Sequence, residues 1–137
     1  MTLSGEQTKK LLEAAAAVRE HAHAPYSNFP VGAAVLDEQG RIHVGCNVEN
    51  SSYPQGTCAE ASAIGAMVAS GGRRIRAILV IGDGEGLCTP CGACRQRISE
   101  HADDETPVLV AGGDRVRATF TLEQLLPHSF GPENLAR

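Results

Sequence analysis

Residues 76–81 read RAILVI, and this short apolar run constrains the fold more than any other segment. A run in which polar and apolar residues do not alternate is typical of a strand buried on both faces, because each face packs on helices. The neighbouring segments have helical patterns: residues 58–70 are Ala-rich and precede two glycines, and residues 91–101 follow a proline. The run therefore predicts a sheet with helices on both faces.

The rest of the chain supplies further strands and helices around this strand. A first helix is expected over residues 4–23, with a capping box formed by Ser4 and Gln7 and an end set by Pro25. Strands are expected over residues 30–37, 41–48, 107–111 and 115–120, and a short last helix over residues 121–126. This order predicts an α/β fold, a three-layer α/β/α sandwich with a mixed sheet of about five strands. The length of 137 residues and the lack of a linker predict a single domain over residues 1–137.

The charge and hydropathy of the chain exclude several classes of protein. The net charge of −4 argues against nucleic-acid partners, whose phosphates are bound by Lys and Arg. No stretch approaches the roughly 20 apolar residues that span a bilayer, and the first ten residues lack a secretory pattern. A cytoplasmic, reducing location is therefore expected. In that setting an odd count of five cysteines points to metal binding or catalysis.

Three of these cysteines have the spacing of a metal site. Cys91 and Cys94 form a Cys-x-x-Cys at the start of a predicted helix, and Cys58 begins another. A helix N-terminus favours the thiolate form of cysteine, so two such ends meeting at one ion would favour three thiolates. Three protein ligands leave the fourth tetrahedral position of Zn²⁺ open to water, as in catalytic zinc sites. Glu60, two residues after Cys58, fits the proton-transferring glutamate of zinc deaminases.

The other two cysteines leave an alternative open. Cys88 precedes Cys91 by three residues, so Cys58 with Cys88, Cys91 and Cys94 could instead form a closed structural zinc site. The intervening Pro90 and the position of Glu60 argue against it. Cys46, inside a predicted strand, is interpreted as a core thiol. The five histidines have no ligand spacing and are expected at the surface or at helix caps.

Together with the segments PYSNFPVGAA (25–34), GCNVENSSY (45–53) and LLPHSF (125–130), these motifs closely resemble the small homotetrameric cytidine deaminases. The resemblance runs from about residue 25 to about residue 130 in the family's order. It implies the cytidine deaminase fold, one Zn²⁺ per subunit and a nucleoside substrate. It also implies a homotetramer in which neighbouring subunits share their sites.

The resemblance also implies roles for individual residues. Asn47 and Glu49 match the positions that hydrogen-bond the ribose, and their alternate positions on a strand would place them on one side. Phe29 matches an aromatic residue lining the pyrimidine pocket, and the Ala59 N–H matches the donor to the 2-oxo group. Tyr53 and Phe130 match residues that reach a neighbouring subunit's site.

The implied reaction is hydrolytic deamination of cytidine and 2′-deoxycytidine in pyrimidine salvage. Glu60 takes a proton from the attacking water, protonates N3 of the base and then the departing amine. One position departs from the family pattern: many members have Arg directly after this glutamate, where it offsets thiolate charge, and this chain has Ala61. Arg95, beside Cys94, could compensate in part. Zinc-water acidity and turnover depend on this difference.

Three other functions remain open at this point. A deaminase of the same fold could act on another aminonucleoside, such as a nucleoside antibiotic or a modified cytosine nucleoside. A non-catalytic, zinc-stabilised binding module would need the metal but not Glu60. Polynucleotide editing is disfavoured by the acidic balance and by the lack of a basic, aromatic-rich segment.

Overall fold

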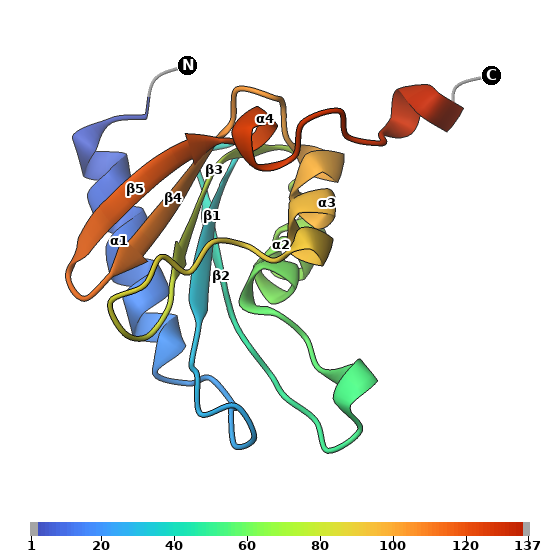
Figure 1. Ribbon diagram of the computed structural model, residues 1–137. Helices are drawn as coiled ribbons and strands as arrows, with labels where there is room; N and C mark the ends of the chain where they lie inside the picture. Colours follow the sequence, from blue (N-terminus) through green and yellow to red (C-terminus); the bar gives the residue numbers. More distant parts are fainter. Residues whose placement is uncertain (1–2, 136–137) are drawn as a thin grey trace.

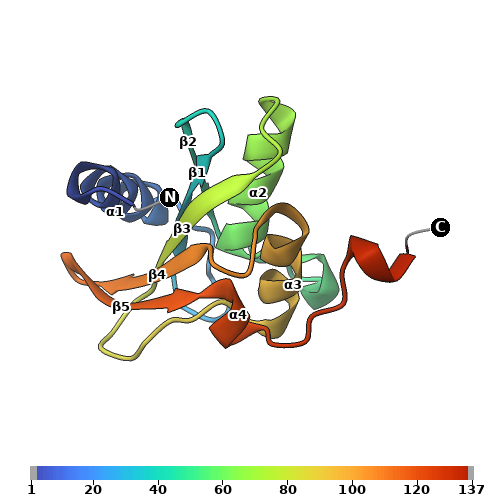
Figure 2. The same ribbon diagram turned by 90° about the horizontal axis from the view of Figure 1, so that it is seen from above.

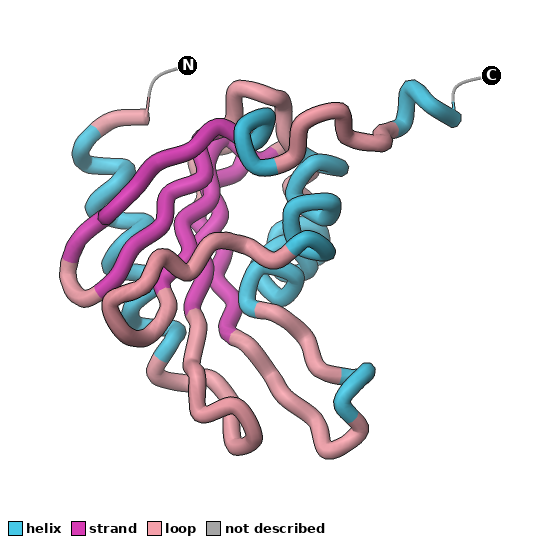
Figure 3. The backbone as a smooth tube through the Cα atoms, viewed as in Figure 1, coloured by secondary structure: helices cyan, strands magenta, loops and turns pink. Residues whose placement is uncertain are grey.

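Helices cover both faces of a five-stranded sheet in the computed structural model, which describes residues 3–135 (Figures 1 and 2). The helices are α1 (Gly5–Arg19), α2 (Ala59–Ala69), α3 (Gly92–His101) and α4 (Leu122–Leu125), with short 3-10 turns η1 (Tyr53–Gln55) and η2 (Pro132–Leu135). The strands are β1 (Gly32–Asp37), β2 (Ile42–Cys46), β3 (Ile75–Ile81), β4 (Pro107–Gly112) and β5 (Arg115–Thr121). Figure 3 shows the same elements along the backbone.

The strand order is β2-β1-β3-β4-β5, with the predicted apolar strand β3 at the centre. β3 pairs with β4 in parallel and with β1 in the antiparallel direction, and the two remaining pairs are antiparallel. The parallel pair requires a crossover between its strands, and α3 lies in that connection. The predicted three-layer α/β/α sandwich with a mixed five-stranded sheet is confirmed.

Alternate residues of the central strands face two separate cores. Ala33 and Val35 of β1 pack with Met67 of α2 on one face, whereas Ala34 and Leu36 pack on the other face, which α1 covers. β3 divides in the same way, and six of its seven residues are buried, five of them consecutively from Ala77 to Ile81. Burial on both faces explains why polar and apolar residues do not alternate along this strand.

Two elements end earlier than the sequence predicts. The Ser4–Gln7 capping box is present, but α1 ends at Arg19, six residues before Pro25. The backbone of His23 instead hydrogen-bonds with that of Asn47 and Glu49. The strand predicted over residues 41–48 ends at Cys46 because the Asn47 side chain bonds to the segment before β1. Both changes join the segment after α1 to the segment after β2.

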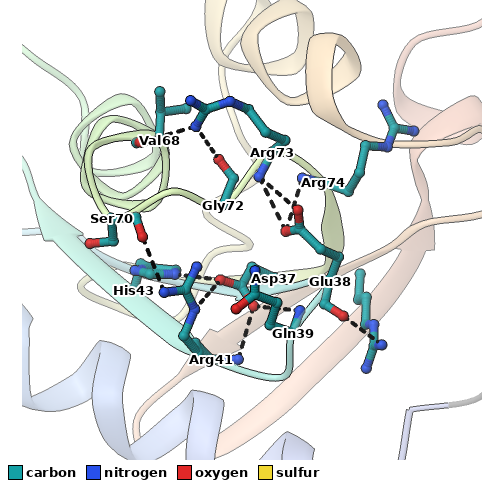
Figure 4. A network of polar contacts seen from close by, with 11 residues as sticks. Asp37, Glu38, Gln39, Arg41, His43, Val68, Ser70, Gly72, Arg73 and Arg74 are labelled. Atoms are coloured by element: carbon teal, nitrogen blue, oxygen red, sulfur yellow. Dashed lines mark hydrogen bonds and ion pairs between the residues drawn. The ribbon is translucent and has the colours of Figure 1, made fainter.

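A polar network lies where β1 turns into β2 (Figure 4). Asp37 is fully buried and accepts hydrogen bonds from the Arg41 guanidinium at 3.0 Å and from the backbone N–H groups of Gln39 and Arg41. His43 Nε2 lies 2.8 Å from the same carboxylate. The expectation that every histidine lies at the surface or at a cap is therefore wrong for His43, whose side chain is 9% exposed. Arg41 also donates to the carbonyl of Ser70, the residue that caps the C-terminus of α2.

The described residues include no helix long and apolar enough to cross a membrane. After α4 the chain leads away from the sheet and ends in η2 (Figure 1).

Candidate metal centre and active site

Three cysteine sulfurs meet where the N-termini of α2 and α3 approach each other. Cys58 is the N-cap of α2, Cys91 is the N-cap of α3, and Cys94 lies in the first turn of α3. The three Sγ atoms all lie within 4.8 Å of one another. The structure therefore brings together the three predicted metal ligands, although Cys58 and Cys94 are 36 positions apart in the sequence.

Close packing against β2 positions the first turn of α2. Gly45 of β2 lies so near the helix that a Cβ atom there would come within 2.3 Å of the Ala63 nitrogen and 2.6 Å of the Ala59 oxygen. Real Cβ atoms do not approach backbone atoms so closely, so only glycine allows this contact. The approach sets the place of Cys58 and Glu60 relative to the sheet.

The donor set fits zinc. Tetrahedral zinc with Zn–S bonds near 2.3 Å needs sulfurs about 3.8 Å apart, which agrees with the grouping of the three Sγ atoms. In the protein alone, burial raises the pKa of the Cys58 and Cys94 thiols, whereas a hydrogen bond from the Cys94 N–H lowers the pKa of Cys91. Three adjacent thiolates are stable only beside a cation, and a bound dication keeps such thiols deprotonated.

Glu60 lies in the first turn of α2 and is only 5% exposed. Burial raises the pKa of its carboxyl group, and the positive charge of Arg97 acts in the opposite direction. A carboxyl group with a raised pKa can both accept and donate a proton near neutral pH. This is the behaviour required of a general acid and base beside a metal.

A cavity of about 240 Å³ opens onto these groups. Its lining includes Cys58, Glu60 and Cys91 from the metal centre, and Phe29, Asn47 and Ala59 among the predicted substrate-binding residues. Ala59 is the first residue of α2, where backbone N–H groups have no partner within the helix. The cavity thus combines a metal centre, a buried carboxyl group, an aromatic ring and free hydrogen-bond donors.

Glu49 and Tyr53 line an adjoining pocket of about 340 Å³, and Ser27 lines both pockets. The Glu49 carboxylate accepts hydrogen bonds from the backbone of Tyr26 at 3.0 Å and of Ser27 at 3.1 Å, and from the Ser27 hydroxyl. Asn47 bonds to Val31 and Phe29 of the same loop. The two side chains therefore face the same segment, although the strand expected to place them there ends at Cys46. Ser27 lies in the segment 25–34 that carries the family resemblance, but only its contacts give it a place in the site.

Two predicted substrate-binding residues lie far out on the surface. Tyr53 is 74% exposed and packs at an angle against Tyr26, with ring centroids 5.8 Å apart. Phe130 is 57% exposed and lies on the segment after α4, where its carbonyl accepts a hydrogen bond from Gln96. The structure does not bring Phe130 into the metal cavity of its own chain.

The structure argues against a closed four-cysteine site. Cys88 lines the cavity beside Thr89, but the group of sulfurs within 4.8 Å of one another contains only Cys58, Cys91 and Cys94 in the described part of the chain. Burial raises the pKa of the Cys88 thiol, which favours its protonated form. Cys46, at the end of β2, is partly buried, so it is not the fully enclosed core thiol that its strand position predicts.

Arg95 and Arg97, the two arginines of α3, have different partners. Arg95 donates to the carbonyls of Pro90 and Leu125 at 2.8 and 2.9 Å and to the Thr89 hydroxyl. It holds the loop before α3 against α4 and makes no bond to a sulfur, so the expectation that Arg95 offsets thiolate charge is not supported by its contacts. Arg97 does contact a ligand, with its Nη1 lying 3.6 Å from Cys94 Sγ.

The sequence of this chain is similar to those of known proteins. Residues 5–110 match the family described as the cytidine and deoxycytidylate deaminase zinc-binding region. The cytidine deaminase of Sporosarcina psychrophila is 43% identical over 128 residues, covering 93% of this chain and 94% of that protein.

Solved structures agree with this match. The crystal structure of cytidine deaminase from Burkholderia pseudomallei superimposes with a TM-score of 0.83 at 41% identity, over 93% of this chain and all of the other. That of cytidine deaminase from Mycobacterium leprae gives a TM-score of 0.75 at 41% identity, over 87% of this chain and 96% of the other. The similarity extends over nearly the whole fold in both cases.

Proposed function

This chain belongs to the family of zinc-binding cytidine and deoxycytidylate deaminases, and on that premise we propose that it deaminates cytidine and 2′-deoxycytidine. Water replaces the 4-amino group of the base, so the products are ammonia and uridine or 2′-deoxyuridine. The observation that carries this proposal is the buried carboxyl group of Glu60 in a cavity that also exposes the ligands Cys58 and Cys91. A closed structural zinc site would not need a carboxyl group there.

Each group at the cavity has a defined part in this reaction. Cys58, Cys91 and Cys94 would hold the zinc ion, which as a Lewis acid would bring the pKa of water to about 7. Glu60 accepts a proton from the attacking water and passes it to N3 of the pyrimidine; it then takes the second water proton from the new C4 hydroxyl and delivers it to the amine, so that the C4–N bond breaks and the C4 carbonyl forms. The Ala59 N–H donates to the 2-oxo group. Backbone carbonyls of the loop at Thr89 and Pro90 accept hydrogen bonds from the amino group.

The remaining predicted residues bind the substrate in this proposal. Phe29 lines the pyrimidine pocket, whereas Asn47 and Glu49 hydrogen-bond the ribose. The position of Asn47 in the metal cavity, and of Glu49 in the adjoining pocket, supports an elongated ligand that extends from base to sugar. The loop that Glu49 holds through Tyr26 and Ser27 would then form one wall of the ribose site.

We further propose a homotetramer of single-domain subunits in the cytoplasm, serving pyrimidine salvage. The exposed rings of Tyr53 and Phe130 support the shared sites of this assembly, because each ring lies outside the metal cavity of its own chain. A neighbouring subunit could supply both rings to a cavity that is otherwise open to solvent.

A substrate panel tests the reaction. Purified, zinc-loaded protein is given cytidine, 2′-deoxycytidine, cytidine monophosphate and free cytosine, and the fall in cytosine absorbance and the release of ammonia are followed. Glu60→Gln should lower kcat by more than about 10⁴-fold, because one group moves several protons, while the zinc content stays at one per chain. Absence of both signals with every cytosine compound would refute cytidine and 2′-deoxycytidine as the substrates.

Glu49→Gln tests whether Glu49 binds the ribose of cytidine. If Glu49 binds the ribose, the variant should lose kcat/KM for cytidine by roughly 10²-fold, the loss of a charged hydrogen bond to substrate, and should leave activity on free cytosine unchanged. An equal loss on both compounds would mean that Glu49 acts only by holding the loop of Ser27. A small loss on both would favour another aminonucleoside as substrate.

A further inference from the structure

Arg97 is the one arginine or lysine within residues 3–135 that hydrogen-bonds to a sulfur of the metal centre. Its Nη1 lies 3.6 Å from Cys94 Sγ, within the range of hydrogen bonds to sulfur. Arg97 does not line the metal cavity, which is bounded by Cys58 and Cys91 but not by Cys94. The guanidinium group therefore contacts the centre from outside the cavity.

Helix geometry explains why position 97 can reach the ligand. Arg97 follows Cys94 by three residues in α3, and side chains on a helix lean toward its N-terminus, so residues three apart contact each other. Ala61 lies three residues after Cys58, which is the N-cap of α2, whereas Cys94 lies within α3. The methyl group of Ala61 cannot donate a hydrogen bond, so α2 provides no cation for the sulfur that it carries.

The charge of the centre shows why one cation matters. Three thiolates and a dication leave one net negative charge, and the Glu60 carboxylate lies in the same cavity. Cys94 is 0% exposed, whereas Cys58 is partly exposed and Cys91 is exposed. Water can solvate the charge on the other two sulfurs but not that on Cys94. The sulfur with the least solvent is thus the one with a guanidinium partner.

We infer that Arg97 is a positioning residue that neutralises part of the charge on the Cys94 sulfur, and so strengthens the metal as a Lewis acid. A sulfur that shares its lone pair with a guanidinium donates less electron density to the metal. The metal then polarises the attacking water more strongly. This inference rests on the zinc site of the proposed function and adds a specific partner to it.

Cobalt substitution and zinc release test this inference without relying on turnover. Arg97→Met should move the sulfur-to-cobalt charge-transfer band to lower energy, because the sulfur lone pair loses a cationic partner. Release of zinc to a chromogenic chelator should become roughly tenfold faster, as is typical when a partner of a metal ligand is removed. In steady-state assays kcat should fall while KM for cytidine is unchanged, since Arg97 does not touch the cavity.

Three further variants make the result specific. Arg115→Met removes the same charge from an exposed position on β5 and should match the unmodified protein. Ala61→Arg added to Arg97→Met should return the band and the release rate toward their original values. Arg97→Gln keeps hydrogen-bond donors without the charge, and it serves in place of Arg97→Met if thermal melting shows that the methionine variant does not fold.

The outcomes are distinct. The inference is overturned if Arg97→Met and Arg97→Gln both have the charge-transfer band and the zinc release rate of Arg115→Met. It is also overturned if Arg97→Gln keeps the band of the unmodified protein while Arg97→Met does not, because the charge would then have no effect. If the unmodified protein binds cobalt without a charge-transfer band, the three-thiolate site itself is wrong and the proposed function fails with it. A normal band in the unmodified protein with no change on substitution would reject only the role of Arg97.

Discussion

Glu60 and Asp37 are two buried carboxyl groups at opposite ends of α2, and their surroundings shift their pKa values in opposite directions. Burial raises the pKa of Glu60 and suits it to moving protons. Burial also acts to raise the pKa of Asp37, but hydrogen bonds from His43, Arg41 and Gln39 outweigh it and hold the pKa well below its usual range. Asp37 is therefore a permanent anion that stabilises the fold.

Asp37→Asn tests this difference. A carboxyl group with a lowered pKa in the folded state contributes stability that is complete above its unfolded pKa, near 3.9, and is lost as pH falls toward the folded pKa. At pH 7 the substitution should lower the free energy of unfolding by about 1.5–3 kcal/mol, the loss of charged hydrogen bonds. The difference should shrink as the pH falls below about 4, as measured by denaturant unfolding across this range. If the loss of unfolding free energy in Asp37→Asn stayed constant with pH, the lowered pKa of Asp37 would be contradicted.

At the scale of elements, the contact between β2 and the first turn of α2 determines where the metal ligand Cys58 and the proton carrier Glu60 lie. Gly45 makes the contact possible because it has no Cβ atom. α2 is thus fixed near both ends, by Gly45 at its start and by the Arg41 hydrogen bond to Ser70 at its end. A helix held in this way carries catalytic groups without needing a long helix or strong capping.

Gly45→Ala should displace α2 and lower both stability and zinc content. The added methyl group meets backbone atoms at 2.3 and 2.6 Å, and overpacking of this kind costs about 1–3 kcal/mol. Gly65→Ala is the matched control, because a Cβ atom there has no neighbour within 4 Å and alanine favours the helix. Unfolding in denaturant and zinc analysis after dialysis would show the difference. Equal behaviour of the two variants would contradict the role given to Gly45.

The elements were predictable where local signals were strong. The apolar run that became β3, the Ser4–Gln7 capping box and the cysteines at two helix starts all appear in the structure as predicted. The end of α1 could not be predicted, because the backbone of His23 pairs with the segment after β2 and does not continue the helix. Such long-range pairing leaves no local pattern in the sequence.

The residues of the site likewise divide into those with a local sequence signal and those without one. The ligand spacing identified Cys58, Cys91 and Cys94. No spacing pointed to the roles of Ser27 and Asp37, which depend on contacts across the fold. For Arg97 a signal was available, namely its spacing of three residues from Cys94 on one helix. Arg95, the nearer neighbour in sequence, points to the loop of Pro90 instead.

At the scale of the whole molecule, the segment after α4 extends beyond the sandwich (Figure 2). Phe130 is 57% exposed, and Leu135 near the end of the same segment is 63% exposed. Apolar side chains on a projecting segment are typical of a surface that packs on another protein. A neighbouring copy of this chain is the partner that the proposed tetramer provides.

Phe130→Ala tests the shared site. If Phe130 packs on the base in a neighbouring subunit, the variant should raise KM for cytidine by roughly tenfold, as expected from the loss of about 1.4 kcal/mol of stacking. Leu135→Ala, on the same segment, is the control that changes apolar area without the ring. Light scattering gives the size of each form. A monomer with full activity would contradict both the tetramer and the part given to Phe130.

The crossover from β3 through α3 to β4 affects when the metal can bind during synthesis. Cys58 and Glu60 leave the ribosome well before Cys91 and Cys94, and Ile98 of α3 packs in the same core as Val108 of β4. An incomplete chain that stops before residue 107 therefore carries all three thiols but lacks the strand that holds α3 in position. Zinc insertion should follow folding, and newly made chains should pass through a stage in which their cysteines are open to oxidation.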